Sequence, residues 1–134
     1  PERMPEAVEE LLRYDGPVQV AFPAVAAAPV EVGGVTIPAG DVVLPALLAA
    51  NRDPARFTAP DRLDITRSPN PHMAFGHGLH HCVGAPLARL EGRIALGALL
   101  ARFPGLRLAD PAAEPARPPG LLINGLVALP VVLA

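Results

Sequence analysis

The sequence holds 134 residues, of which 51% are hydrophobic and 18% charged, with a formal net charge of −2, one cysteine and no tryptophan. A chain of this length is one domain's worth and is long enough to bury roughly two-thirds of its unfolded surface. The balanced charge argues against nucleic acid or an anionic membrane surface as the main partner, and no run of about eighteen apolar residues predicts a membrane span.

The first predicted element is a helix that begins near Pro5, a residue suited to the first helical turn, and is stopped by the run Arg-Tyr-Asp-Gly-Pro at 13–17. Its acidic residues favour the positive end of the helix dipole, and its apolar residues recur at helical spacing. These residues are Glu6, Glu9 and Glu10, and Val8, Leu11 and Leu12.

Residues 18–48 favour extended structure, because β-branched side chains alternate with turn signals. The Gly33-Gly34 pair, flanked by the runs 29–32 and 35–37, predicts a β-hairpin. The short apolar run 45–50 is predicted to form a helical turn or two.

Residues 51–73 are rich in Pro, Asp, Arg and Asn and predict a long ordered loop, which in a compact domain is usually functional. A long helix is predicted from about Pro86 to the Pro-Gly pair at 104–105. The apolar runs 121–123 and 126–133 are predicted to form a final pair of strands. The predicted fold class is therefore α+β.

Cys82 cannot form an internal disulfide or a CxxC metal clip, so it is a buried small hydrophobe, a free thiol or a ligand. Glycines on both sides allow the backbone to turn sharply and to approach a flat object. The helix that begins a few residues later presents unpaired N–H groups, which stabilise a thiolate. Such a thiolate is suited to ligate iron, and sulfur ligation in haem proteins favours O–O cleavage.

The segment 75–84, Phe-Gly-His-Gly-Leu-His-His-Cys-Val-Gly, resembles the cysteine loop of the cytochromes P450, F-G-x-G-x-H-x-C-x-G. The matching residues are Phe75, Gly76, Gly78, His80, Cys82 and Gly84. The resemblance implies that Cys82 is the proximal ligand of a haem b iron, that Phe75 packs near the sulfur and that His80 contacts a haem propionate. It also implies that the loop glycines shape this pocket.

Two further motifs extend the resemblance along nearly the whole chain. Glu10 and Arg13 match the family's E-x-x-R, a spacing that places both residues on one helix face. The loop after Asn51 is similar to the family's meander, and the resemblance implies that Arg62 closes a structural triad with Glu10 and Arg13.

The resemblance is to the C-terminal portion of a soluble, cytoplasmic, bacterial-type member, as a single domain or fragment over residues 1–134. It implies O₂-dependent oxygen insertion into a small organic substrate, with electrons from a ferredoxin-type donor. The family's distal helix, with its acid–threonine pair, has no counterpart in this sequence, since Asp41 is followed by Val42. Ala24 stands where an arginine that pairs with a propionate is expected.

Several alternatives remain open at this stage. Without its loop, Cys82 is most simply an inert thiol, and its neighbourhood of histidines admits a zinc site. The residues of that candidate zinc site are His72, His77, His80, His81 and Cys82. Arg89 and Arg93 form either a solvated face or a docking surface for an acidic electron donor. The chain as a whole is alternatively a truncated, non-catalytic relative that acts as a structural or interaction module and self-associates through exposed apolar surface.

Overall fold

A computed structural model describes residues 2–134 as a mixed structure of helices and short antiparallel strands. The helices are α1 (Met4–Asp15), α2 (Leu47–Ala50), the 3₁₀ turn η1 (Gly78–His80) and α3 (Ala85–Arg102). The strands are β1 (Ala24–Val25), β2 (Val30–Val32), β3 (Val35–Ile37), β4 (Val42–Val43), β5 (Arg107–Leu108) and β6 (Val131–Val132). The α+β class, the first helix, the short helix after residue 45 and the long helix are confirmed.

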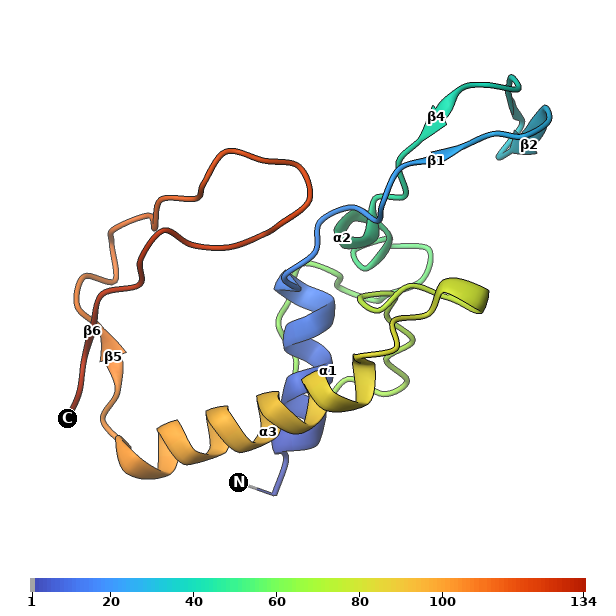
Figure 1. Ribbon diagram of the computed structural model, residues 1–134. Coiled ribbons are helices and arrows are strands. Elements are labelled where there is room, and N and C mark those ends of the chain that lie inside the picture. The colour runs from blue at the N-terminus through green and yellow to red at the C-terminus, as the bar shows by residue number, and fades with distance from the viewer. Residues whose placement is uncertain (1) are drawn as a thin grey trace.

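The centre of the structure is the crossing of α1 and α3 (Figure 1). Gly92 of α3 faces Val8 of α1, and a methyl group added at Gly92 would lie 3.3 Å from Val8 Cγ1. This close approach joins the first and the longest helix directly, although they are far apart in the sequence.

The predicted hairpin is confirmed. β2 pairs antiparallel with β3 through the register Val32 to Val35, and the two-residue turn between them is Gly33-Gly34. Both glycines have positive φ, +58° and +79°, a conformation that side chains disfavour. β1 and β4 continue the pairing below the hairpin, and together the four strands form an arm that extends from the helices (Figure 1).

The predicted pairing of the two C-terminal apolar runs is wrong. Within the run 126–133, β6 pairs antiparallel with β5, which precedes the Pro-rich connector. The run 121–123 bonds to the segment after α1, through a bridge between Ile123 and Val18. An apolar run predicts extended backbone without specifying its partner, which is decided by contacts distant in sequence.

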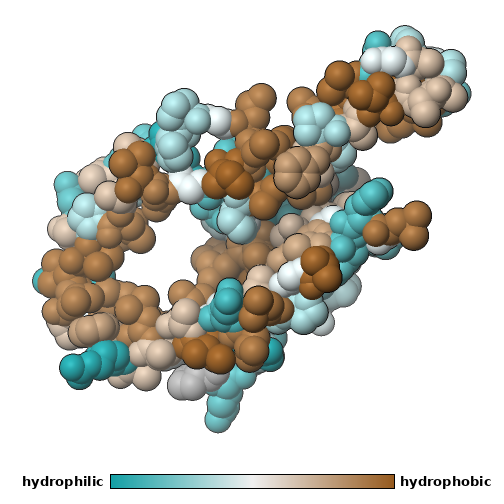
Figure 2. Space-filling model, in the orientation of Figure 1, coloured by the Kyte–Doolittle hydropathy of each residue, from teal (hydrophilic) through white to brown (hydrophobic). Residues whose placement is uncertain are grey.

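The C-terminal segment forms an arc that leaves an open gap beside the helices, and apolar side chains colour much of the arc and of the strand arm (Figure 2). Large apolar side chains are exposed on α3 and on the C-terminal arc, among them Leu87, Ile94, Leu121 and Val127. Within residues 2–134, no helix combines the length and the apolar character that a bilayer span requires.

Candidate functional site

The most buried part of the structure is an ion pair on one face of α1. Glu10 and Arg13 are 1% and 0% exposed, and the Arg13 guanidinium donates Nε to Glu10 Oε2 at 2.8 Å and Nη2 to Glu10 Oε1 at 2.9 Å. Arg13 also donates to the carbonyls of Asn51, Pro60 and Arg62 at 2.8–3.0 Å. A buried guanidinium is tolerated when its N–H groups have acceptors, so Arg13 ties α1 to the loop 51–73.

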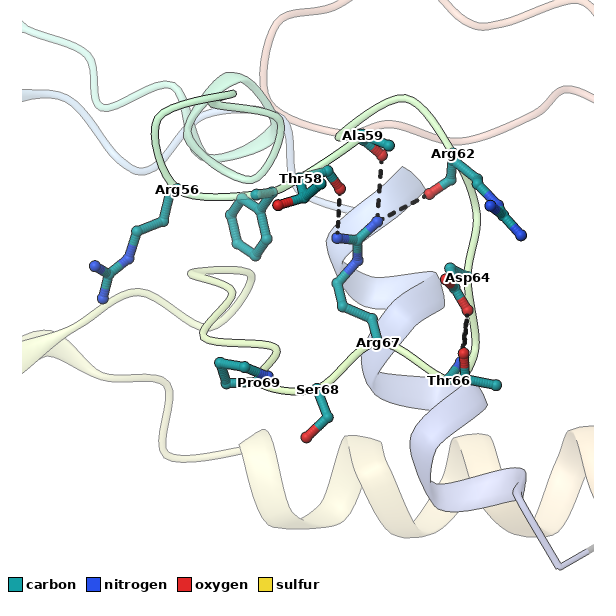
Figure 3. A pocket seen from close by; sticks show the side chains of 10 residues that line it. Arg56, Thr58, Ala59, Arg62, Asp64, Thr66, Arg67, Ser68 and Pro69 are labelled. Atoms are coloured by element: carbon teal, nitrogen blue, oxygen red, sulfur yellow. Dashed lines mark hydrogen bonds between the residues drawn. The ribbon is translucent and has the colours of Figure 1, made fainter.

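Arg67, and not Arg62, is the second arginine at Glu10. Arg67 Nε lies 3.2 Å from Glu10 Oε2, and its other nitrogens donate to the carbonyls of Thr58, Ala59 and Arg62. The side chain of Arg62 is exposed and points away from Arg67, so only its carbonyl takes part (Figure 3). The predicted triad of Glu10, Arg13 and Arg62 is corrected to Glu10, Arg13 and Arg67, because the turn at 59–62 directs the Arg62 backbone inward.

Several donors share the Glu10 carboxylate. Besides the two arginines, the backbone N–H of Asp64 donates to Oε1 at 2.8 Å and Asn70 Nδ2 donates to Oε2 at 3.1 Å. Burial raises the pKa of Glu10, but the hydrogen bonds from Arg13, Asp64 and Arg67 outweigh burial, and the net pKa is lowered from its ordinary value of 4.5. We call Glu10, Arg13, Asn51 and Arg67 the buried polar centre.

The cysteine loop, residues 75–84, presents Cys82 at the surface. The Cys82 backbone N–H donates to the Phe75 carbonyl at 2.9 Å, and the Cys82 carbonyl accepts from Ala85 N–H at 3.2 Å, where α3 begins. Gly76 and Gly78 both have φ of +72°, which bends the loop in a way that side chains disfavour. The thiol therefore lies between a sharply turned loop and the N-terminus of an 18-residue helix.

Behind the loop, Phe75 is held by charged residues. The Arg89 guanidinium lies 4.6 Å from the centroid of the Phe75 ring and bonds in a bidentate manner to Glu9 of α1. Arg89 is thus tied into the structure and not simply part of a solvated face. Burial raises the pKa of Glu9, but Arg89 and His72 outweigh it, so the pKa is lowered from 4.5, while the same hydrogen bond raises the pKa of Arg89.

The histidines of the loop are dispersed. His77, His80 and His81 are exposed, whereas His72 bonds to Glu9 through Nε2 at 2.9 Å. Within residues 2–134, no three His, Cys, Asp or Glu side chains gather in an arrangement that would hold a metal ion. A role for His80 toward a propionate stays a prediction.

Comparison with known proteins identifies the arrangement of buried ion pair, loop and exposed cysteine. A family model described as Cytochrome P450 matches residues 4–123. The chain is 51% identical to the mycinamicin IV hydroxylase/epoxidase of Micromonospora griseorubida over 133 residues, which are 98% of this chain and 34% of that protein. It is 53% identical to the cytochrome P450 monooxygenase PikC of Streptomyces venezuelae over 93% of this chain and 30% of that protein. The chain belongs to the cytochrome P450 family and spans about a third of the length of these relatives.

Solved structures agree with the assignment. The tirandamycin C-bound P450 monooxygenase TamI superposes with a TM-score of 0.96 at 47% identity, covering 99% of this chain and 33% of that one. P450BioI, in complex with an acyl carrier protein that carries a fatty acid, superposes with a TM-score of 0.93 at 49% identity, covering 100% of this chain and 34% of that one. The predicted fold, part of the cytochrome P450 fold, is confirmed.

Cytochromes P450 hold a haem, and the residues of the cysteine loop fit one. The thiol is exposed, and so are the side chains of Leu79 and Val83, three residues before and one residue after Cys82 in the sequence, which suits a flat apolar ring. A methyl group added at Gly84 would lie 3.7 Å from Cys82 Sγ, so glycine keeps the side of the sulfur open. Thiolate sulfur is among the axial ligands that haem iron takes in proteins.

Sequence reasoning did not predict the contact of Arg67 with Glu10 or the contact of Glu9 with Arg89. No local sequence signal shows that Arg67 rather than Arg62 reaches Glu10, since both arginines lie in the same loop, which has no periodicity. Glu9 and Arg89 are 80 residues apart, and their pairing follows from the crossing of α1 and α3. Only the tendency of acidic and basic residues on packed helices to pair could have pointed to that contact.

Proposed function

We propose that this chain is the haem-binding part of a cytochrome P450 monooxygenase, with Cys82 as the axial ligand of a haem b. The single observation that carries the proposal is the exposed Cys82 thiol at the N-terminus of α3, held there by the bond between its N–H and the Phe75 carbonyl. The full exposure of Leu79 and Val83, which belong to the same loop as Cys82, supports the proposal, because a bound ring would cover apolar side chains of this loop.

When bound, the haem supplies oxygen chemistry in which one atom of O₂ enters an organic substrate and the other leaves as water. Cys82 would hold the iron through its thiolate sulfur and would donate electron density to it. Cys82 lies three residues before the start of α3, at the end of the helix where the dipole is positive. The buried polar centre holds the loop 51–73 against α1, and so supports the cysteine loop that follows it.

We propose that the substrate is a small organic molecule. We also propose that the residues of this chain do not select its chemical class. Relatives named for different compounds are similarly identical to the chain: 51% for the mycinamicin IV enzyme, 48% for 6-deoxyerythronolide B hydroxylase and 51% for nocardicin C N-oxygenase. This even similarity supports the proposal that the segment carries what these proteins share, which would be the thiolate side of the haem.

We further propose that electrons reach this protein in the cytoplasm from an acidic donor of the ferredoxin type. The exposed arginines of the described surface, such as Arg56 and Arg62, would steer an acidic partner toward it. This donor is tested separately, by the dependence of the reduction rate on salt.

A second candidate function is a non-catalytic interaction module. The observation that favours it is the large number of exposed apolar side chains on α3 and the C-terminal arc, because such surface promotes association. A module of this kind would self-associate whether or not haem is added.

The test is the visible absorption spectrum of the purified chain after addition of haem, and then after reduction under carbon monoxide. A Soret band shifted far to the red in the reduced carbonyl form, lost in Cys82→Ala and retained in His77→Ala, is expected if the thiolate binds the iron. His77 is the matched control because it lies in the same loop and is exposed. Haem uptake that ignores Cys82, or no uptake together with a multimeric solution mass, favours the interaction module instead.

A further inference from the structure

Glu9 connects three segments of the chain behind the cysteine loop. Its Oε1 accepts from Arg89 Nε at 2.6 Å, and its Oε2 accepts from Arg89 Nη2 at 3.0 Å and pairs with His72 Nε2 at 2.9 Å. Glu9 belongs to α1, Arg89 to α3, and His72 to the segment just before the cysteine loop. One carboxylate therefore fixes the relative positions of two helices and the entry to the loop.

The tautomer of His72 follows from its other nitrogen. Nδ1 accepts a hydrogen bond from the Ala74 backbone N–H at 3.2 Å, so in the neutral imidazole Nε2 carries the hydrogen and donates it to Glu9. The side chain of His72 is 3% exposed, which shields this bond from water. The Glu9 carboxylate is thus held from both sides.

Arg89 is connected to the cysteine through Phe75. Its guanidinium lies over the Phe75 ring at 4.6 Å from the centroid, a distance at which a cation and an aromatic face attract. Phe75 is also the residue whose carbonyl accepts the N–H of Cys82 at 2.9 Å. The contacts therefore run without interruption from Glu9 through Arg89 and Phe75 to the backbone of Cys82.

We propose that Glu9 and Arg89 are positioning residues for the thiolate: they hold Phe75, and through Phe75 the Cys82 backbone, and thereby set the donor strength of the sulfur. The inference rests on the proposed haem site and concerns residues outside both the cysteine motif and the buried polar centre. Charge enters as well, because Glu9 neutralises the Arg89 cation behind the loop. Without the carboxylate, the uncompensated positive charge favours addition of an electron to a haem bound at Cys82.

The first experiment needs no haem. Hydrogen exchange of the Cys82 amide is measured in the full chain and in Glu9→Gln and Arg89→Ala. We expect the amide to exchange about tenfold faster in both variants, the effect of losing one such contact on local opening. Arg93→Ala is the matched control, since Arg93 lies one turn further along α3 and bonds to the Arg89 carbonyl and not to Glu9. Protection of the Phe103 amide, bonded to the Leu99 carbonyl at the far end of α3, shows that the helix is intact.

The second experiment measures the reduction potential and the reduced carbonyl spectrum of the haem-loaded chain. Glu9→Gln is expected to raise the potential and to lower the fraction with the far-red Soret band, whereas Arg93→Ala leaves both unchanged. Arg89→Lys keeps a cation near Phe75 but loses the bidentate bond to Glu9. The fraction of Arg89→Lys with the far-red Soret band is expected to lie between the fractions for Arg89→Ala and for the unsubstituted chain.

Unchanged Cys82 exchange in both Glu9→Gln and Arg89→Ala, with the Phe103 amide still protected, overturns the inference. An unchanged potential in haem-loaded Glu9→Gln overturns it as well. If the unsubstituted chain takes up no haem, the proposed function fails, whereas the exchange experiment still decides whether Glu9 and Arg89 hold the Cys82 backbone.

Discussion

The buried polar centre and the cysteine loop differ in what they bury and what they expose. In the buried polar centre, charged groups are removed from water and the Arg13 guanidinium donates to five oxygens of this same chain. In the cysteine loop, the thiol of Cys82 and the apolar side chains of Leu79 and Val83 face outward. The scaffold is thus completed by the chain's own atoms, whereas the cysteine loop presents a surface suited to a flat partner.

The difference also shows which interactions hold this chain together. Among residues 2–134 the buried apolar residues are few, namely Val8, Leu47, Phe57 and Ala85, while the largest fully buried side chains are Arg13, Glu10 and Asn51. Burying charges costs free energy unless they are paired and hydrogen-bonded. The segment 51–73 is therefore ordered mainly by specific polar bonds to α1, which permit one arrangement and penalise others.

The most damaging substitution should lie in the buried polar centre. Arg13→Ala is expected to lower the free energy of unfolding by about 3–5 kcal/mol, because it leaves the Glu10 carboxylate buried with fewer donors and removes the Arg13 hydrogen bonds to three backbone carbonyls. The measurement is urea denaturation followed by circular dichroism. A loss below about 1 kcal/mol, similar to that of a surface arginine such as Arg93→Ala, would show that the ion pair only breaks even with its desolvation cost.

The corrected triad gives a direct contrast between two arginines. Arg67→Ala removes a partly buried partner of Glu10 and should cost about 1–3 kcal/mol of unfolding free energy, as expected for a hydrogen-bonded charged group. Arg62→Ala keeps the carbonyl that accepts from Arg13 and Arg67, and should change stability by less than about 0.5 kcal/mol. The two urea midpoints decide the matter, and the reverse order would restore Arg62 to the triad.

The cysteine loop and the hairpin could be predicted because their signals are local. Gly33-Gly34 fits a two-residue turn, and the glycines at 76 and 78 adopt the positive φ that their identity allows. The start of α3 at Ala85 lies next to the expected Pro86, since proline fits a first helical turn. Such features depend on a few neighbouring residues, which a sequence pattern contains.

The remaining features depend on contacts distant along the chain. Arg62 and Arg67 are the same residue type in the same loop, so the resemblance to the family's meander assigned the wrong arginine to Glu10. The partner of β6 is β5 rather than the nearer run at 121–123, because both apolar runs are compatible with extended backbone. The Glu9–Arg89 pair exists only because α1 and α3 cross.

Acid should lower the stability of the protein through two carboxylates of α1, Glu9 and Glu10. The pKa values of Glu9 and Glu10 are lowered from 4.5 in the folded protein, so their contribution to stability is complete above that value and is lost as the pH falls through the folded pKa. The urea midpoint should therefore decline as the pH is lowered from about 6 to about 3. Glu9→Gln should flatten part of this decline, while Glu6→Gln, an exposed residue of the same helix, should leave it unchanged.

The smallest expected change in stability distinguishes the part of α3 that packs on α1, at Gly92, from the part with open space beside it, at Gly97. Both Gly92 and Gly97 lie inside the helix, where alanine is favoured over glycine by about 1 kcal/mol. At Gly97 nothing lies within 4 Å of an added methyl group, so Gly97→Ala should raise the unfolding free energy by about 0.5–1 kcal/mol. At Gly92 the methyl would press on Val8 of α1 at 3.3 Å, and the gain should be offset. Equal gains at both positions would mean that the crossing of α1 and α3 yields easily, and that the contact between the helices is less tightly packed than the buried polar centre beside it.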